Sequence, residues 1–237
     1  MAQPSALLSI VLRACDELTL PRPSVVYAST DAQTRQMLAF LQEEGRYLMM
    51  CNEWSFLRTL YTFPTVASTA TYAVPSDFDR VIADTMWDQT NDTKVNGPDV
   101  AQIDRWRQQS TTGAASIRLN YRLIGSNIQL WPTPTAVATI GYEYISTKWA
   151  RSSSSVAQTE FLADTDTTVF DPYLLIKGLK WRFRSAKKMN AEAEKIEYEN
   201  YLEMCKGKES GETLNMEGSY GSQFISMDNV PDTGFAV

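Results

Sequence analysis

The chain has 237 residues, 43% apolar and 11% aromatic, enough to bury a hydrophobic core in one domain with insertions or in two joined modules. Its formal net charge of -6, from 22 basic and 28 acidic residues, argues against a protein whose main task is to grip nucleic acid by its phosphates. It contains no histidine, which removes the usual general base and the usual zinc ligand.

The amino-terminal region lacks the features of a secretion signal or a membrane span. Polar residues such as Gln3 and Ser9 interrupt its apolar stretch, and no run elsewhere approaches the roughly 20 apolar residues that a membrane helix needs. The three cysteines, Cys15, Cys51 and Cys205, are odd in number and far apart, which is typical of reduced thiols. We therefore expect a protein synthesised in a cytoplasm, without a disulfide framework and without a membrane partner.

Two amino-terminal helices are predicted. Apolar residues recur at helical spacing over residues 5–18, and Pro21 stops the pattern. A second apolar stripe follows Ser29, Thr30 and Asp31, which are all good N-caps, and predicts a helix over residues 31–52. Gln33 stands three residues after Thr30, as in a capping box. We assign residues 1–56 to the N-terminal helices of a bundle.

Residues 57–150 are rich in β-branched and aromatic side chains and are expected to form an antiparallel β-rich portion with a short helix. The clearest signal lies in residues 117–124, where apolar and polar side chains alternate ahead of a turn at Gly125. Gly97 opens a polar segment that is predicted to be helical as far as Ser110. Strands are predicted over residues 57–63, 69–74, 80–87, 117–124, 128–131 and 140–144.

A loop and a long helix are predicted next. Residues 151–171 begin with a polar, serine-rich stretch, which indicates a loop. Asp171 is a good N-cap and Pro172 suits the first helical position. The apolar stripe that follows predicts the C-terminal helix of the bundle over residues 172–206, with Asn190 as a candidate bend.

Residues 207–237 show no helical or strand period and are rich in Gly, Ser, Asn and Asp, which predicts an extended C-terminal arm. The arm still contains apolar residues that a purely solvating tail would not need, and we interpret them as anchors for a partner. They are Phe224, Ile225, Val230, Phe235 and Val237. The fold class expected for the whole chain is α+β: a helical bundle of two N-terminal helices and the long C-terminal helix, an antiparallel β-rich portion and this arm.

The predicted long helix has a basic first half and an acidic second half. Basic residues clustered on one element can neutralise nucleic-acid phosphates, but their stems also cover apolar surface, and they can pair with the acidic half of a neighbouring copy. An inter-subunit face and a face toward a DNA channel both stay open. The residues concerned are Lys177, Lys180, Arg184, Lys187 and Lys188.

The stretch Phe161–Pro172 contains Asp164 and Asp166 in the Asp-x-Asp-x-Thr spacing of one class of metal-dependent phosphotransferases. In those enzymes a continuous apolar strand leads into the first aspartate, whereas residues 151–160 are mostly polar here. We therefore favour a turn into the capped helix, with Asp166 and its neighbouring threonines bonded to local backbone, and expect no cofactor and no enzymatic activity. A metal-dependent phosphohydrolase that uses the two aspartates is the alternative.

The order and spacing of several segments resemble the bacteriophage head-to-tail adaptor proteins of short-tailed phages. The likeness extends over about residues 5–206 and rests on no single motif. The segments that contribute to it are Thr71–Arg80, Trp87–Asp88, Trp106, Leu130–Pro134, Tyr142–Ser146, Phe161–Asp166 and Leu174–Arg182.

This resemblance implies a structural virion protein at the head-to-tail junction. It implies a homo-dodecameric ring bound to the portal protein and joined to tail or nozzle proteins, with the arm docked on the portal and DNA passing transiently through the centre. An acidic chain suits a channel that does not hold the DNA. Another phage tail structural protein is a further alternative with the same broad composition.

Overall fold

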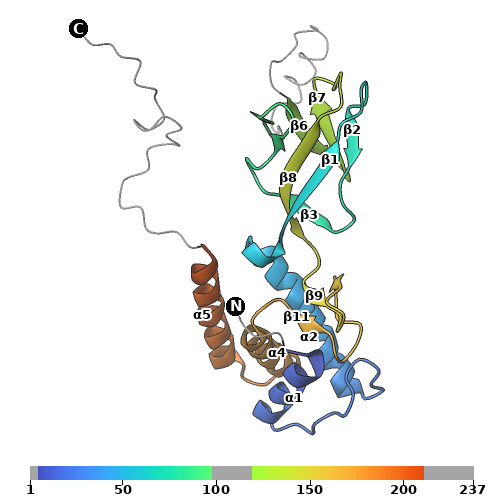
Figure 1. Cartoon of the computed structure of the whole chain (residues 1–237). Helices are drawn as coiled ribbons and strands as arrows, with labels where there is room; N and C mark the ends of the chain where they lie inside the picture. Colours follow the sequence, from blue (N-terminus) through green and yellow to red (C-terminus); the bar gives the residue numbers. More distant parts are fainter. Residues whose placement is uncertain (1–4, 98–118, 211–237) are drawn as a thin grey trace, which may run out of the picture.

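A computed structural model describes residues 5–97 and 119–210 of the chain. In Figure 1 these residues form a helical part with a β-rich part stacked on one end of it. Each part has its own cluster of buried apolar side chains. The predicted α+β class is confirmed.

The first two helices lie close to their predicted bounds. Helix α1 spans Leu7–Glu17 and helix α2 spans Ala32–Cys51. The carboxylate of Asp31 accepts a hydrogen bond of 2.8 Å from the backbone N–H of Thr34, which satisfies one of the amides that a helix start leaves unpaired. Both predicted helices are confirmed, and of the three candidate caps the structure uses Asp31 rather than Thr30 of the capping box.

The predicted long helix over residues 172–206 is wrong, because this segment is a hairpin of two helices. Helix α4 spans Pro172–Ala186 and helix α5 spans Glu192–Ser210. Lys188 adopts a φ of 56°, in the left-handed region that interrupts a right-handed helix, and the Asn190 side chain then accepts a hydrogen bond of 3.2 Å from the Glu192 N–H. The candidate bend is therefore a reversal, and α5 lies beside α4 (Figure 1).

The helical core includes Trp149, whose side chain is completely buried although in sequence it lies outside the helices. Its ring packs edge to face on Phe161, with 4.9 Å between centroids. Gly45 of α2 faces the same indole so closely that a Cβ there would overlap it. Trp149 lies where the chain leaves the β-rich part, and its side chain thus packs directly on the backbone of α2.

The main sheet is antiparallel and has the order β1–β8–β4–β5, with β3 also paired to β8. A short 3-10 turn over Ser55–Leu57 leads from α2 into it. The single strand predicted over residues 80–87 is two strands, because Asp84 adopts a φ of 63° and turns the chain. The strands are β1 (Arg58–Pro64), β3 (Phe78–Val81), β4 (Trp87–Asp88), β5 (Thr93–Lys94) and β8 (Thr139–Ser146).

A second antiparallel sheet has the order β2–β7–β6, from β2 (Thr71–Ala73), β7 (Asn127–Trp131) and β6 (Asn120–Ile124). The predicted hairpin is confirmed: β6 and β7 meet at a turn in which Gly125 has a φ of 57°, a conformation that favours glycine. Between the two sheets lies a core with many aromatic residues: Phe63, Tyr121, Tyr142 and Tyr144, together with Met86, Val95, Ile128, Leu130 and Ile140.

The segment predicted as a loop, residues 151–171, is largely irregular but takes part in a small antiparallel sheet. Its order is β10–β9–β11, from β9 (Ala150–Arg151), β10 (Ala157–Gln158) and β11 (Thr167–Thr168). The arm predicted from residue 207 begins later, since α5 continues to Ser210. The predicted short helix near residues 97–110 and the arm beyond residue 210 lie outside the described residues.

We predict that Gly45→Ala lowers the free energy of unfolding by about 1–3 kcal/mol, because the added methyl group overpacks the contact with Trp149. Urea unfolding followed by tryptophan fluorescence measures the change. Gly207→Ala in α5 is the matched control: its Cβ would meet nothing within 4 Å, so it should add about 0.5–1 kcal/mol of stability through helix propensity alone. A neutral Gly45→Ala would contradict the close packing.

Candidate assembly interface

The two aspartates of the Asp-x-Asp-x-Thr stretch both bind backbone amides. The carboxylate of Asp164 accepts hydrogen bonds from the N–H groups of Val26, at 3.1 Å, and Tyr27, at 2.7 Å. The carboxylate of Asp166, only 2% exposed, accepts from Leu162 and Ala163 at 2.6 and 2.8 Å. Each carboxylate therefore satisfies amides that would otherwise lack partners in a partly buried loop.

The backbone of the same stretch holds the start of α1. The N–H of Leu7 donates to the Asp166 carbonyl at 2.8 Å, and the N–H of Leu8 donates to the Asp164 carbonyl at 3.2 Å. These bonds satisfy two of the free amides at the first turn of α1. The stretch thus fastens the beginning of α1 and the link before α2 to the segment that leads into α4.

This geometry supports the interpretation of the stretch as a structural hinge. The predicted bonding of Asp166 to local backbone is confirmed, and so is the Asp171 cap, which accepts from the Tyr173 N–H at 2.9 Å. Among the described residues, no group of three or more Cys, Asp or Glu side chains is placed to hold a metal ion. The phosphohydrolase alternative gains no support from the position of its two aspartates.

Helices α2, α4 and α5 meet at a buried glutamate. Glu44 of α2 has 0% exposure, and its carboxylate accepts hydrogen bonds from the Arg182 guanidinium of α4, at 2.6 Å, and from the Tyr198 hydroxyl of α5. Gly178 of α4 makes room for it, since a Cβ there would lie 2.6 Å from the Glu44 carboxyl carbon. Arg182 also donates to Glu43 at 2.6 Å.

Burial sets the electrostatics of this cluster. Loss of water contact raises the pKa of Glu44 above its usual range, although the hydrogen bonds from Tyr198 and Arg182 act in the opposite direction. Burial also raises the pKa of Tyr198, and the neighbouring Glu44 carboxylate adds to the effect, so the phenol stays protonated and donates. Full pairing is what makes a carboxylate tolerable at this depth.

Three of the five basic residues singled out from the sequence form ion pairs within the chain. Lys177 pairs with Glu197 and Arg184 with Glu194, so the basic and acidic halves of the segment meet across the hairpin. The first of these contacts lowers the pKa of Glu197 through the hydrogen bond from Lys177. Lys180 instead reaches Glu17 of α1 at 2.7 Å. These pairs position α5 and α1 against α4.

The other two, Lys187 and Lys188, lie at the turn of the hairpin. Both are exposed, and within the part of the chain that the structure describes neither forms an ion pair. The Lys187 ammonium lies 5.3 Å from the centre of the Phe183 ring. Within the predicted basic face, the two lysines at the hairpin turn are therefore the ones available for contacts beyond the described residues.

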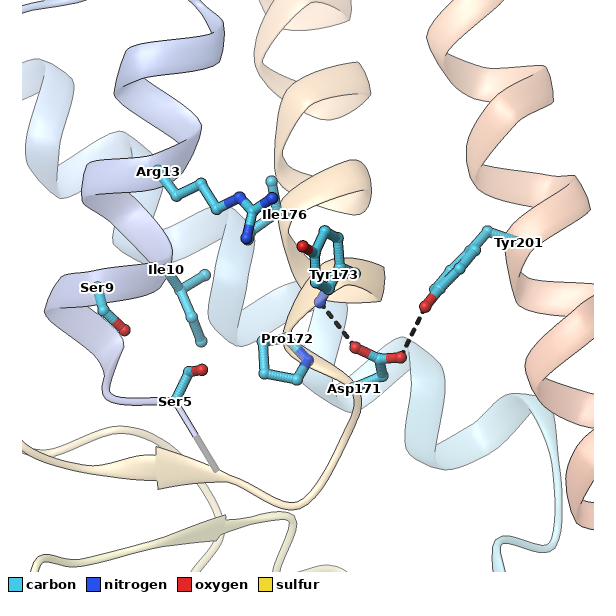
Figure 2. Close-up of a pocket in the computed structure, with 9 residues that line it drawn as sticks. All are labelled: Ser5, Ser9, Ile10, Arg13, Asp171, Pro172, Tyr173, Ile176 and Tyr201. Atoms are coloured by element: carbon cyan, nitrogen blue, oxygen red, sulfur yellow. Dashed lines mark hydrogen bonds between the residues drawn. The ribbon is translucent and has the colours of Figure 1, made fainter. Parts of the chain in front are cut away.

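A groove of about 520 Å³ opens between α1, α4 and α5 (Figure 2). At one side Asp171 joins two helices: it accepts from the Tyr173 N–H at its own helix start and from the Tyr201 hydroxyl of α5 at 2.7 Å. On the other side the Arg13 guanidinium stacks 4.2 Å from the centre of the Tyr173 ring. The remaining lining residues are Ser5, Ser9, Ile10, Pro172 and Ile176.

Sequence reasoning missed both the Glu44 cluster and the groove. In sequence Glu44 looks like an ordinary polar position beside Glu43, and only its place opposite Gly178 makes it internal. The groove depends on α5 turning back toward α1, which a continuous helix would not allow. The anchors Phe224, Ile225, Val230, Phe235 and Val237 lie outside the described residues.

In the described residues, buried charges tie helices together, the two aspartates bind backbone amides and the α+β fold has two cores. Among the helices of the described residues, none combines the length and hydrophobicity needed to cross a bilayer. The chain belongs to the SU10 adaptor protein family, whose family model matches residues 6–215. This membership confirms the resemblance to phage head-to-tail adaptors and makes the chain a structural component of a bacteriophage virion. No curated protein has a matching sequence.

We predict that Asp166→Ala lowers the free energy of unfolding by about 2–4 kcal/mol, because it leaves the partly buried amides of Leu162 and Ala163 without their charged acceptor. Thermal or urea unfolding measures the loss. Glu203→Ala is the control: this exposed side chain pairs only with Lys206 one turn away, and its removal should change stability by less than about 0.5 kcal/mol. Equal effects of the two substitutions would refute the structural role of Asp166.

We predict that Glu44→Gln alters how stability depends on pH. Because the folded-state pKa of Glu44 is raised, its ionisation costs stability as pH rises from the ordinary value of 4.5 through the folded value. The stability of the wild type relative to the Gln variant should therefore fall over that window in urea unfolding at a series of pH values. Glu197→Gln, at a lowered pKa, should give the opposite trend: the wild type loses its advantage as pH falls. Parallel curves for both variants would contradict the account.

Proposed function

We propose that the chain is a head-to-tail adaptor that forms a dodecameric ring on the portal protein and joins it to tail or nozzle proteins, leaving a channel for DNA. The observation that supports this is the family match over residues 6–215, which includes both cores and every described helix and strand. In this proposal the work of the protein is assembly, and no step of it requires a cofactor.

The hairpin turn is the part of the helical surface we propose for contacts between copies or with passing DNA. Lys187 and Lys188 project there as exposed cations, while Lys177, Lys180 and Arg184 serve the fold through their ion pairs. The chain as a whole has a charge of -6, so a neighbouring copy offers acidic surface for these two lysines. DNA can pass such a ring transiently without being held.

The carboxyl-terminal arm is the segment we propose for portal binding. Its apolar anchors, Phe224, Ile225, Val230, Phe235 and Val237, lie beyond residue 215, where the family match ends. An arm that orders on binding loses conformational entropy, and burial of these anchors in the portal would offset that loss. The tight association of a ring with its portal then depends on twelve copies of a modest contact.

We predict that deletion of residues 211–237 leaves a folded protein that no longer binds the portal of the same virus. The cut after Ser210 preserves α5. Within the full chain, Phe224→Ser with Phe235→Ser should weaken binding at least about tenfold, as loss of buried aromatic anchors does. Co-sedimentation with portal rings measures it.

The matched control for the double substitution is Ser219→Ala with Ser222→Ala, which changes two small side chains of the same arm and should leave binding unchanged. Circular dichroism of each variant checks that the domain is folded. Portal binding retained by the deletion variant would overturn the role of the arm.

A further inference from the structure

Strand β1 lies at an open edge of the main sheet. Within the described part of the chain, β8 is the strand that pairs with it, from Arg58 opposite Ile145 to Pro64 opposite Thr139. The other side of β8 is occupied by β3 and β4. The outer edge of a seven-residue strand is thus available to a further strand.

The hydrogen bonds around β8 show which residues of β1 point outward. The Glu143 carbonyl accepts from the Ile82 N–H at 3.0 Å, so the backbone groups of Glu143 face β3. In an antiparallel pair the residues alternate in direction, and Leu60, which is opposite Glu143, therefore faces away from β8. The Thr65 N–H donates to the Ala138 carbonyl at 2.7 Å. Thr65 therefore faces the β8 side, as expected if odd-numbered residues of this segment point toward β8 and Leu60 points away.

The free edge consequently presents the N–H and C=O of Leu60 and of Thr62, and the carbonyls of Arg58 and Pro64. The N–H of Arg58 is already used, since it donates to the Ser55 carbonyl. Native edges are commonly protected by charged side chains or by proline in the strand. Arg58 and Pro64 stand at the two ends of β1, whereas residues 59–63 between them contain neither a charge nor a proline, and Leu60 is 63% exposed.

The end of α5 lies beside the beginning of this strand. The Glu209 carboxylate accepts hydrogen bonds from the backbone N–H of Ser55, at 3.0 Å, and from its hydroxyl, at 2.6 Å. Ser55 begins the short turn that leads into β1. The chain therefore leaves α5 close to the edge, and about ten extended residues, at roughly 3.3 Å each, are enough to reach any point along it.

The sequence beyond α5 contains one run suited to strand pairing. Residues 223–227, Gln-Phe-Ile-Ser-Met, have no glycine, proline or charge and include two residues that favour strands. Gly218 and Gly221 precede the run, and Asp228 and Pro231 follow it, so it has the length and the punctuation of a short strand.

We propose that, in the isolated protein, Gln223–Met227 adds as an extra strand to the free edge of β1, exchanging backbone hydrogen bonds with Leu60 and Thr62 of the same molecule. This goes beyond the proposed function and does not depend on it. Through this pairing the apolar arm binds its own domain when no portal is present. Strand addition suits this edge because backbone groups supply the binding and need no matching pocket.

Amide hydrogen exchange of the isolated full chain, resolved by NMR, tests the proposal. The amides of Leu60 and Thr62 should exchange at least about tenfold more slowly in the wild type than in Ile225→Pro, because proline removes a ladder donor from the added strand. Thr213→Pro, in the same segment but outside the run, is the matched control and should exchange like the wild type. The amides of Tyr61 and Phe63, which face β8, should be equally protected in all three proteins.

Two results would overturn the proposal. The first is exchange of Leu60 and Thr62 in the wild type as fast as in Ile225→Pro. The second is protection that increases with protein concentration, since it would assign the edge to a strand of another copy. Both measurements are made without portal, so the outcome is independent of whether the arm binds portal.

Discussion

The ion pair between Glu44 and Arg182 is the contact on which the helical part depends. It joins α2 to α4, and the Tyr198 hydroxyl brings α5 to the same carboxylate. A buried pair of this kind adds little stability compared with apolar packing, but loss of one partner leaves an uncompensated charge that costs roughly 3–5 kcal/mol. We therefore interpret the cluster as a specificity device that favours one arrangement of the three helices, with Gly178 allowing the close approach of α4.

The hairpin and the hinge follow from that arrangement. Once α5 is held against α4, Asp171 can receive the Tyr201 hydroxyl, and the groove beside α1 is formed. The stretch around Asp164 and Asp166 fastens the start of α1 through backbone bonds. Side chains that resemble catalytic or nucleic-acid-binding groups thus connect elements that are distant in sequence.

Much of the fold could be predicted from local sequence, and the limits of that prediction are physical. The N-caps at Asp31 and Asp171 and the alternation before Gly125 are local signals, and they gave the correct starts of α2 and α4 and a correct hairpin. Asn190 signalled a bend but not the full reversal, because the left-handed residue is a lysine and the apolar stripe continues past it. The burial of Glu44 could not be predicted either, since it arises from contacts across 138 and 154 positions in sequence. The family likeness, which rests on order and spacing, was recognisable without these contacts.

We propose that this member of the SU10 adaptor protein family works as a ring on a portal. Electron microscopy of the full chain mixed with the portal of the same virus tests it most directly. The account predicts a twelvefold ring of this chain stacked coaxially on the portal, with an open central channel. A chain that stays monomeric and separate from the portal, or that assembles with a different symmetry elsewhere on the tail, would contradict it.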